Sequence, residues 1–332
     1  MPAPLTVLIL GAGQIGAFYD TPDSPHVLTH AHAATLHDSF ELLGFVEPNT
    51  EQAQRAAHCW SVPVYSSIAA AHAVHSAIDI IVIATPDATH EVLLEGILTW
   101  ERLPRLVFAE KPLTLSPEST KAIANRFESV GIPLAVNYTR RFVPEYQALA
   151  QRLQEKAYGE FLGATGYYGK GLFHNGSHML DLLDWFMGVD HETPVTVSET
   201  FVDYREADPT VSALIQSRCG QPIWLKAIPA SRYTIFELDM MFDSARIRLP
   251  NGGLSICTET VIPFDMVPGY EVLGQPVIQP TQIPTALQHA YTALANHLNT
   301  QTPLPCSGTE AYQTLLLCQA IQTRYTQAIQ VV

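Results

Sequence analysis

The sequence predicts two α/β domains: an N-terminal, doubly wound parallel sheet, and a C-terminal α+β domain with an open, mostly antiparallel sheet. A chain of 332 residues is too long for one ordinary hydrophobic core. Short apolar runs alternate with amphipathic stretches up to residue 138, whereas later alternating runs follow one another with few helices between them. These two observations place the domains at residues 1–138 and 139–332.

The first domain is expected to contain six strands joined by helices. The strands are predicted at Leu5–Leu10, Glu41–Glu47, Val62–Tyr65, Asp79–Thr85, Arg105–Ala109 and Pro133–Tyr138. The helices are predicted near Glu51–His58, Ser67–His75, Ala88–Trp100 and Pro117–Val130. Prolines within Tyr19–Pro25 force a loop into the first crossover. Such a loop emerges near the ligand-binding edge of the sheet. His30 and His32 therefore either contact a substrate or lie in solvent on a surface loop.

The second domain is expected to contain six strands and three assigned helices. The strands are predicted at Glu160–Tyr168, Val195–Tyr204, Val211–Arg218, Ile223–Ile228, Thr234–Met241 and Ala245–Leu249. A helix at Ser177–Met187 follows the first strand, and two helices at Thr285–Leu298 and Thr309–Ala328 are expected to close this domain. Apolar residues within 235–241 and 247–249 are predicted to face a dimer or tetramer partner.

Composition argues against several classes of protein. The formal charge of −14 disfavours nucleic acid as a partner, because phosphate binding needs clustered Lys and Arg. The first apolar run, Leu5–Leu10, is far too short to span a bilayer, so no membrane association is expected. Five scattered cysteines without C-x-x-C spacing fit reduced thiols. We therefore expect a cytoplasmic protein with a small-molecule partner.

A glycine motif follows the first predicted strand. In Gly11-Ala12-Gly13-Gln14-Ile15-Gly16, glycines permit a tight turn and let backbone N–H groups approach a pyrophosphate at a helix N-terminus. Glu47 ends the second strand, where a carboxylate can bind the adenine-ribose hydroxyls and repel a 2′-phosphate. Together they predict a Rossmann domain that binds NAD in preference to NADP.

Four further segments carry a family resemblance. They are Ile83-Ala84-Thr85-Pro86 with His90, Glu110-Lys111-Pro112-Leu113, Asn137-Tyr138-Thr139-Arg140-Arg141-Phe142, and Gly176-Ser177-His178-Met179-Leu180-Asp181. In their order and spacing they resemble the Gfo/Idh/MocA family of oxidoreductases, which includes glucose-fructose oxidoreductase and inositol dehydrogenase. The resemblance implies hydride transfer between NAD and a sugar, sugar derivative or polyol, in a homo-oligomer formed through the C-terminal sheet.

The resemblance also implies the catalytic residues. Lys111 would lie at the nicotinamide end of the cofactor, where an ammonium polarises a carbonyl or stabilises an alkoxide. His178 would take the hydroxyl proton as hydride leaves the same carbon. Asp181, three residues later on a helix, could orient that imidazole and lies on the substrate side.

One position departs from the family pattern. The family commonly has an aspartate four residues before the catalytic histidine, and this chain has His174 there. Either His174 takes over the polar contact with substrate, or the proton relay differs. His174 and His178 also have the i, i+4 spacing of metal ligands, but the resemblance implies no metal and Lys111 would repel a dication.

The remaining site residues divide between cofactor and substrate. Thr85, Pro86 and Asn137 are expected to border the cofactor because they lie at the carboxyl ends of strands. The family resemblance implies the same for His90 and Glu110. Tyr138, Arg141, Tyr168 and Lys170 are expected to face the substrate. If Lys111, Arg141 and Lys170 converge, the pocket could attract an anionic substrate such as a nucleotide sugar or sugar acid.

Two other functions use the same fold. An NAD-dependent glycosidase would make the hydride step transient and return the cofactor unchanged. A non-catalytic regulator that senses NAD would keep the glycine motif and need neither Lys111 nor His178. Steady turnover of the nucleotide separates these alternatives from a dehydrogenase.

Overall fold

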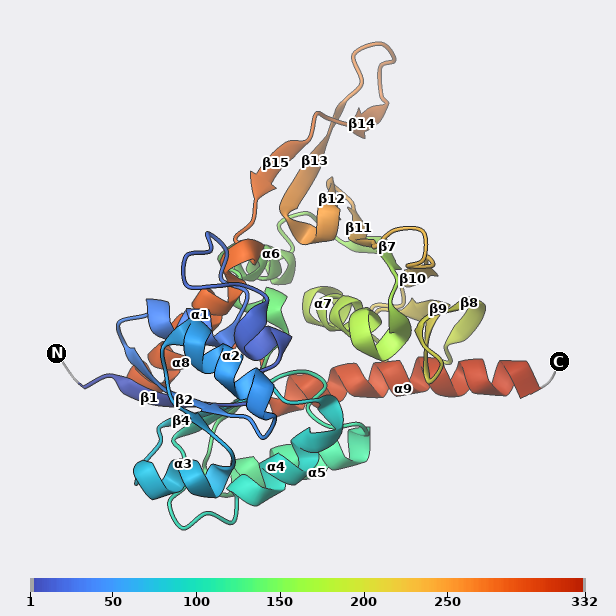
Figure 1. Cartoon of the computed structure of the whole chain (residues 1–332). Coiled ribbons are helices and arrows are strands. Elements are labelled where there is room, and N and C mark those ends of the chain that lie inside the picture. The colour runs from blue at the N-terminus through green and yellow to red at the C-terminus, as the bar shows by residue number, and fades with distance from the viewer. Residues whose placement is uncertain (1–2, 331–332) are drawn as a thin grey trace. The chain divides into compact units, whose positions relative to one another are not determined.

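The computed structural model describes residues 3–330, which form two compact units (Figure 1). The first comprises Met1–Val143 and Pro284–Tyr312, and the second comprises Pro144–Ile283 and Gln313–Val332. The division falls within the last helix, α9 (Gly308–Gln330). The predicted fold class is confirmed, with a parallel sheet in the first unit and a mixed, mostly antiparallel sheet in the second.

The first unit is built on a six-stranded sheet with the order β3-β2-β1-β4-β5-β6. The strands are β1 (Leu5–Leu10), β2 (Phe40–Val46), β3 (Val64–Tyr65), β4 (Ile80–Ile83), β5 (Leu106–Ala109) and β6 (Leu134–Val136). Every adjacent pair is parallel. Nearly every side chain of β1, β4 and β5 is buried, as expected when helices cover both faces of a sheet.

Helices cover this sheet on both sides. They are α1 (His30–Leu36), α2 (Thr50–Trp60), α3 (Ile68–Val74), α4 (His90–Ile97), α5 (Pro117–Ser129) and α8 (Ala286–Thr300). Figure 1 shows α1, α2 and α8 on one face of the sheet and α3, α4 and α5 on the other. α8 packs on α1 and contributes Leu287, Tyr291 and Leu294 to the core of the first unit. The expectation that this helix closes the second domain is therefore wrong.

The predicted loop interrupts the first crossover. A short π-helical turn (Gln14–Phe18) follows the glycine motif, and α1 begins only at His30. Asp20 holds the intervening segment, because its carboxylate accepts the Leu28 N–H at 2.6 Å, the Thr29 hydroxyl at 2.5 Å and His32 Nδ1 at 2.8 Å. His30 and His32 are 0% and 1% exposed, so the alternative of solvated histidines is wrong.

The second unit is built on a nine-stranded sheet with the order β14-β13-β12-β11-β7-β10-β9-β8, in which β15 also pairs with β13. The strands are β7 (Phe161–Tyr168), β8 (Thr196–Arg205), β9 (Asp208–Gln216), β10 (Pro222–Ala227), β11 (Phe236–Phe242), β12 (Ala245–Leu249), β13 (Ser255–Pro263), β14 (Glu271–Leu273) and β15 (Val277–Pro280). Only the β7–β10 pair is parallel among the pairs described.

The helices α6 (Pro144–Gln154) and α7 (Ser177–Met187) and most of α9 belong to the same unit as this sheet. α7 packs closely on β7: a Cβ at Gly166 would lie 2.8 Å from the Met179 sulfur. Leu238, Met240, Ile247 and Leu249 are buried within the unit, so the expectation that these apolar stretches face a partner is wrong for them. Met241, in the first of these stretches, is exposed. Other exposed apolar side chains lie on β7, β8 and β10 and on β13, β14 and β15, the last three of which extend beyond the rest of the sheet in Figure 1.

Candidate active site

In the glycine turn after β1, Gly11 and Gly16 are tightly packed, whereas Gly13 borders open space. Gly11 has φ +95°, and a Cβ there would lie 2.7 Å from the Ala84 carbonyl oxygen. A Cβ at Gly16 would lie 2.4 Å from the Gly11 carbonyl oxygen. A Cβ at Gly13 would instead meet nothing nearer than the Ala84 oxygen, at 3.9 Å. The close contacts of the chain therefore explain Gly11 and Gly16, but not Gly13.

The π-helical turn that follows begins at Gln14, directly after Gly13. Gln14 and Ile15 therefore lie in a first helical turn, where backbone N–H groups have no intrahelical acceptor. Gln14 is exposed and Ile15 is half-buried. Such a turn can bind the oxygens of a pyrophosphate.

The Glu47 carboxylate lies directly beside this turn. β1 and β2 run parallel with Leu10 opposite Val46, so the residues that follow both strands meet at one edge of the sheet. Glu47 is 9% exposed and accepts the Ala12 N–H at 3.1 Å, the Asn49 N–H at 2.9 Å and the Gln52 amide at 2.9 Å. Three donors thus fix its orientation next to the glycine motif.

His90 links the segments that follow β4 and β5. It is 0% exposed, and its Nδ1 lies 2.8 Å from the Pro112 carbonyl oxygen while its Nε2 lies 3.0 Å from the Thr85 carbonyl oxygen. Thr85 is half-buried, Pro86 is exposed, and the Thr89 hydroxyl donates to the Thr85 hydroxyl. With both ring nitrogens at main-chain oxygens, His90 positions the residues around it and presents neither nitrogen to a ligand.

The half-buried Glu110 and the buried Asn137 form a pair beside Lys111. Glu110 follows β5 and Asn137 follows β6, and the Asn137 amide donates to Glu110 Oε1 at 2.6 Å. The same oxygen lies 3.0 Å from His30 Nε2. Burial raises the pKa of Glu110, but the His30 and Asn137 contacts and the Lys111 charge lower it overall, so the group is a carboxylate. Lys111 is half-buried. Tyr138 and Arg141 lie in the turn that follows β6, and both are buried.

In the second unit, a π-helical segment (Gly171–Gly176) and α7 carry the predicted substrate residues. Asp208, at the start of β9, accepts the Phe173 N–H at 2.8 Å and the His174 N–H at 3.0 Å. The exposed His174 ring stacks on Tyr204, with centroids 4.2 Å apart. These contacts hold the segment that leads to the half-buried His178.

Three other predicted substrate residues have different surroundings. Tyr168 is fully buried, and its hydroxyl donates to the Val211 oxygen and accepts the Val211 N–H, which favours a structural role over the predicted substrate contact. Burial raises its pKa far above the usual range. Asp181 is 1% exposed and accepts the Thr314 hydroxyl at 3.3 Å. Lys170 is exposed, with its N–H bonded to Asp203.

Sequence reasoning missed the residues that support this segment. Asp208, Asp203 and Tyr204 all come from the β8–β9 hairpin, and Thr210 on β9 accepts the Gly171 N–H at 2.7 Å. Asp208 is 34 residues from His174 along the chain, so no local spacing could have indicated the pair. The geometry makes the hairpin the support of the predicted substrate segment.

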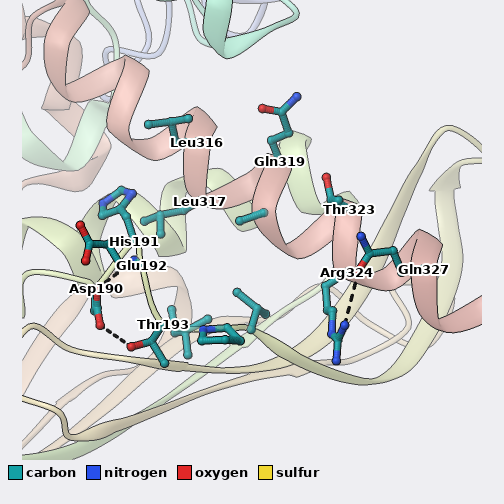
Figure 2. Close-up of a pocket in the computed structure, with 14 residues that line it drawn as sticks. Asp190, His191, Glu192, Thr193, Leu316, Leu317, Gln319, Thr323, Arg324 and Gln327 are labelled. Carbon is teal, nitrogen blue, oxygen red and sulfur yellow. Dashed lines mark hydrogen bonds between the residues drawn. The ribbon is translucent and has the colours of Figure 1, made fainter.

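A cavity of about 680 Å³ lies elsewhere in the second unit (Figure 2). Loop residues such as Asp190 and Thr193 face Leu317 and Arg324 of α9 across it. Within the part of the chain that the structure describes, none of the predicted site residues lines this cavity.

Two further observations concern metal binding and membrane spanning. Among residues 3–330, no three His, Cys, Asp or Glu side chains lie close enough together to hold a metal ion. Over the same residues, no helix combines the length and the apolar character needed to cross a membrane.

Comparison with a curated relative places this chain near inositol dehydrogenases. It is 26% identical to the inositol 2-dehydrogenase of Rhizobium meliloti (strain 1021) over 234 residues. That match covers 64% of this chain and 65% of the relative, slightly less than two thirds of its length.

Solved structures share the fold across almost the whole chain. The WlbA dehydrogenase of Bordetella pertussis, in complex with NADH and UDP-GlcNAcA, has a TM-score of 0.76 at 18% identity and covers 98% of this chain and 97% of that one. A super-repressor mutant of Gal80p from Saccharomyces cerevisiae has a TM-score of 0.76 at 13% identity, with the same coverage. The shared fold therefore includes a dehydrogenase and a repressor.

The sequence of the first unit matches a known protein family. Residues 5–138 match the family described as the oxidoreductase family with an NAD-binding Rossmann fold, Gfo/Idh/MocA. They span β1 to the end of β6 and include the glycine turn, Glu47, Lys111 and Asn137. The first unit of this chain is therefore similar in sequence to the NAD-binding Rossmann unit of the Gfo/Idh/MocA oxidoreductases.

Proposed function

We propose that this chain is an NAD(H)-dependent dehydrogenase or reductase that moves hydride between nicotinamide and a CH–OH carbon of a polyol, sugar or sugar derivative. The observation that carries the proposal is the row of groups at the carboxyl edge of the first sheet. Gly13, Glu47 and Asn137 follow β1, β2 and β6, and parallel strands bring their carboxyl ends to one edge.

Two features of this edge fit a dinucleotide. A Cβ at Gly13 would extend into space that no other part of the chain fills within 3.9 Å, which suits a phosphate that approaches the backbone closely. Asn137 is 1% exposed, yet its Oδ1 has no hydrogen-bond partner among residues 3–330. A buried, unpaired acceptor is costly, and a carboxamide N–H of a bound nicotinamide would satisfy it.

Glu47 supports NAD as the cofactor in preference to NADP. Its carboxylate is fixed beside Ala12 and can accept hydrogen bonds from the adenine-ribose hydroxyls. A 2′-phosphate at the same place would meet a like charge in a largely buried position.

The proposed chemistry uses Lys111, His178 and His174. When bound, NAD supplies a hydride acceptor at its nicotinamide ring. The Lys111 ammonium stabilises negative charge on the reacting oxygen, and His178 accepts the proton of the substrate hydroxyl. His174 replaces the aspartate of related enzymes as a polar contact with substrate, and its stacking on Tyr204 sets the orientation of its ring edge.

Relatives suggest the substrate class. Inositol 2-dehydrogenase and a dehydrogenase bound to a UDP-sugar acid are both similar to this chain. Lys111, Arg141 and Lys170 would favour an anionic sugar over a neutral polyol if they share one pocket.

The exposed apolar side chains of the second sheet support a homo-oligomer. Val277 and Ile278 on β15 are 71% and 62% exposed. Paired surfaces of this kind stabilise symmetric dimers and tetramers. Replacing both residues by Glu should dissociate the assembly, and light scattering would detect the change in mass; a monomeric wild-type protein would contradict the proposal.

The test of the activity is a screen of inositols, sugar acids and nucleotide sugars for change in nicotinamide absorbance. Lys111→Met and His178→Asn should each lower kcat by about 10²–10³-fold. Lys121→Met, at an exposed lysine of α5, is the matched control and should retain activity. Cleavage of a glycoside without net NADH formation would favour the glycosidase alternative, and NAD binding without turnover would favour the regulator.

A further inference from the structure

A chain of buried and half-buried polar side chains runs through the first unit and ends beside Lys111. Tyr291 of α8 is 0% exposed, and its hydroxyl lies 3.4 Å from Nδ1 of His30. Nε2 of His30 lies 3.0 Å from Glu110, which accepts the Asn137 amide at 2.6 Å. The four side chains come from α1, α8 and the ends of β5 and β6.

The partners of His30 fit a single assignment of donor and acceptor to its two ring nitrogens. An N–H at Nε2 donates to the Glu110 carboxylate, which can only accept. Nδ1 then accepts the hydroxyl of Tyr291, whose pKa is raised by burial and by the Glu110 charge, so the phenol keeps its proton. The ring also lies with its centroid 5.2 Å from that of Phe108, in an edge-on arrangement. Packing and hydrogen bonds thus determine the position of His30.

Glu110 determines the orientation of Asn137. The carboxylate needs donors, so the Asn137 NH₂ group must point toward it and Oδ1 must point away. That oxygen is the unpaired buried acceptor assigned to nicotinamide above. The charge of the adjacent Lys111 lowers the pKa of Glu110.

From this geometry we infer that His30 is a positioning residue of the active site, which acts through Glu110 on Asn137 and Lys111. The inference rests on the proposed function, since it assigns His30 a role in binding the nicotinamide half of the cofactor. His30 makes no contact with substrate in this role. It keeps the Glu110 carboxylate oriented so that the Asn137 carbonyl faces the nicotinamide.

The chain contains a matched control in His32. It lies on the same helix and is 1% exposed, but its ring contacts Asp20 at 2.8 Å and not Glu110. Removing its nitrogens disturbs a buried histidine of the same helix while leaving the Glu110–Asn137 pair intact.

The test compares two ligands in isothermal titration calorimetry. NADH reaches Asn137 in the proposed complex, whereas ADP-ribose lacks nicotinamide and cannot. His30→Phe should weaken NADH binding about tenfold, as expected for loss of a hydrogen bond to a charged group. ADP-ribose affinity should not change. His32→Phe should leave the ratio of the two affinities at the wild-type value, and His30→Gln should restore part of the loss.

Each outcome has a separate meaning. Equal weakening of both ligands by His30→Phe would overturn the positioning role, and so would the same selective loss in His32→Phe. Failure of the wild-type protein to bind either ligand would overturn the proposed function and this inference together. A spectrum of ¹⁵N-labelled histidines in the free protein adds a check without cofactor: Glu110→Gln should shift the His30 signals and not those of His32.

Discussion

Alanine substitutions at Gly13 and Gly16 should have opposite effects on stability. Gly13 has φ −78° and ψ −164°, which alanine adopts readily, and its Cβ would meet nothing within 3.9 Å. Gly13→Ala should therefore stabilise the fold by about 0.4–1 kcal/mol, through the lower entropy of the unfolded chain. A Cβ at Gly16 would lie 2.4 Å from a backbone oxygen, so Gly16→Ala should cost about 1–3 kcal/mol.

The same pair should differ in cofactor binding. The Gly13→Ala methyl group would occupy the space assigned to the pyrophosphate and should weaken NADH binding about tenfold or more. Urea unfolding can be followed by the fluorescence of Trp60, whose indole donates to the Ala17 oxygen just after the turn. NADH titrations complete the assay. A Gly13→Ala variant that is destabilised like Gly16→Ala but binds NADH normally would refute this reasoning.

Three further substitutions test other parts of the site. Glu47→Gln removes the charge but keeps an acceptor for the Ala12 N–H, so the ratio of NADPH to NADH affinity should rise about tenfold or more; an unchanged ratio would remove Glu47 from cofactor selection. Asp208→Asn loses an acceptor for the Phe173 or His174 N–H and should lower kcat/KM for substrate while NADH affinity stays constant; a matching loss of NADH affinity would argue against a local effect. Burial raises the pKa of Asp184, but His191, the Val189 N–H and Arg218 lower that pKa overall. The contribution of Asp184 to the stability of the fold is therefore complete above the ordinary carboxyl pKa, and it is lost as the pH falls through the lowered pKa of the folded state. Asp184→Asn should therefore destabilise the protein at neutral pH and converge with wild type in acid, as urea unfolding at several pH values would show; a deficit independent of pH would contradict this assignment.

The fold was predictable wherever burial leaves a pattern in the sequence. All six strands of the first sheet were located. The apolar runs of β1, β4, β5 and β6 are buried on both faces, whereas the short β3 is half-buried. β13, β14 and β15 were missed, since the side chains of β14 and β15 are exposed throughout and show no alternation. α8 was assigned to the wrong unit because its apolar stripe shows that it packs, but not on which sheet.

The site was predictable where its residues are close in sequence or follow neighbouring strands. The glycine turn was predicted from its motif and Glu47 from its place at the end of the second predicted strand, and the structure places Glu47 in contact with Ala12 of the motif. The surroundings of His30 could not be deduced, because its partners Glu110 and Tyr291 lie 80 and 261 residues away. A histidine next to a loop looks the same in sequence whether it ends in solvent or against a buried carboxylate.

A crystal structure of the protein with NADH bound tests the central claim most directly. The account predicts adenine-ribose hydroxyls on Glu47, pyrophosphate oxygens over Gly13, and the nicotinamide carboxamide on Asn137 Oδ1 with Lys111 beside the ring. A dinucleotide bound away from the carboxyl edge of the first sheet, or bound there with adenine at Asn137, would contradict it.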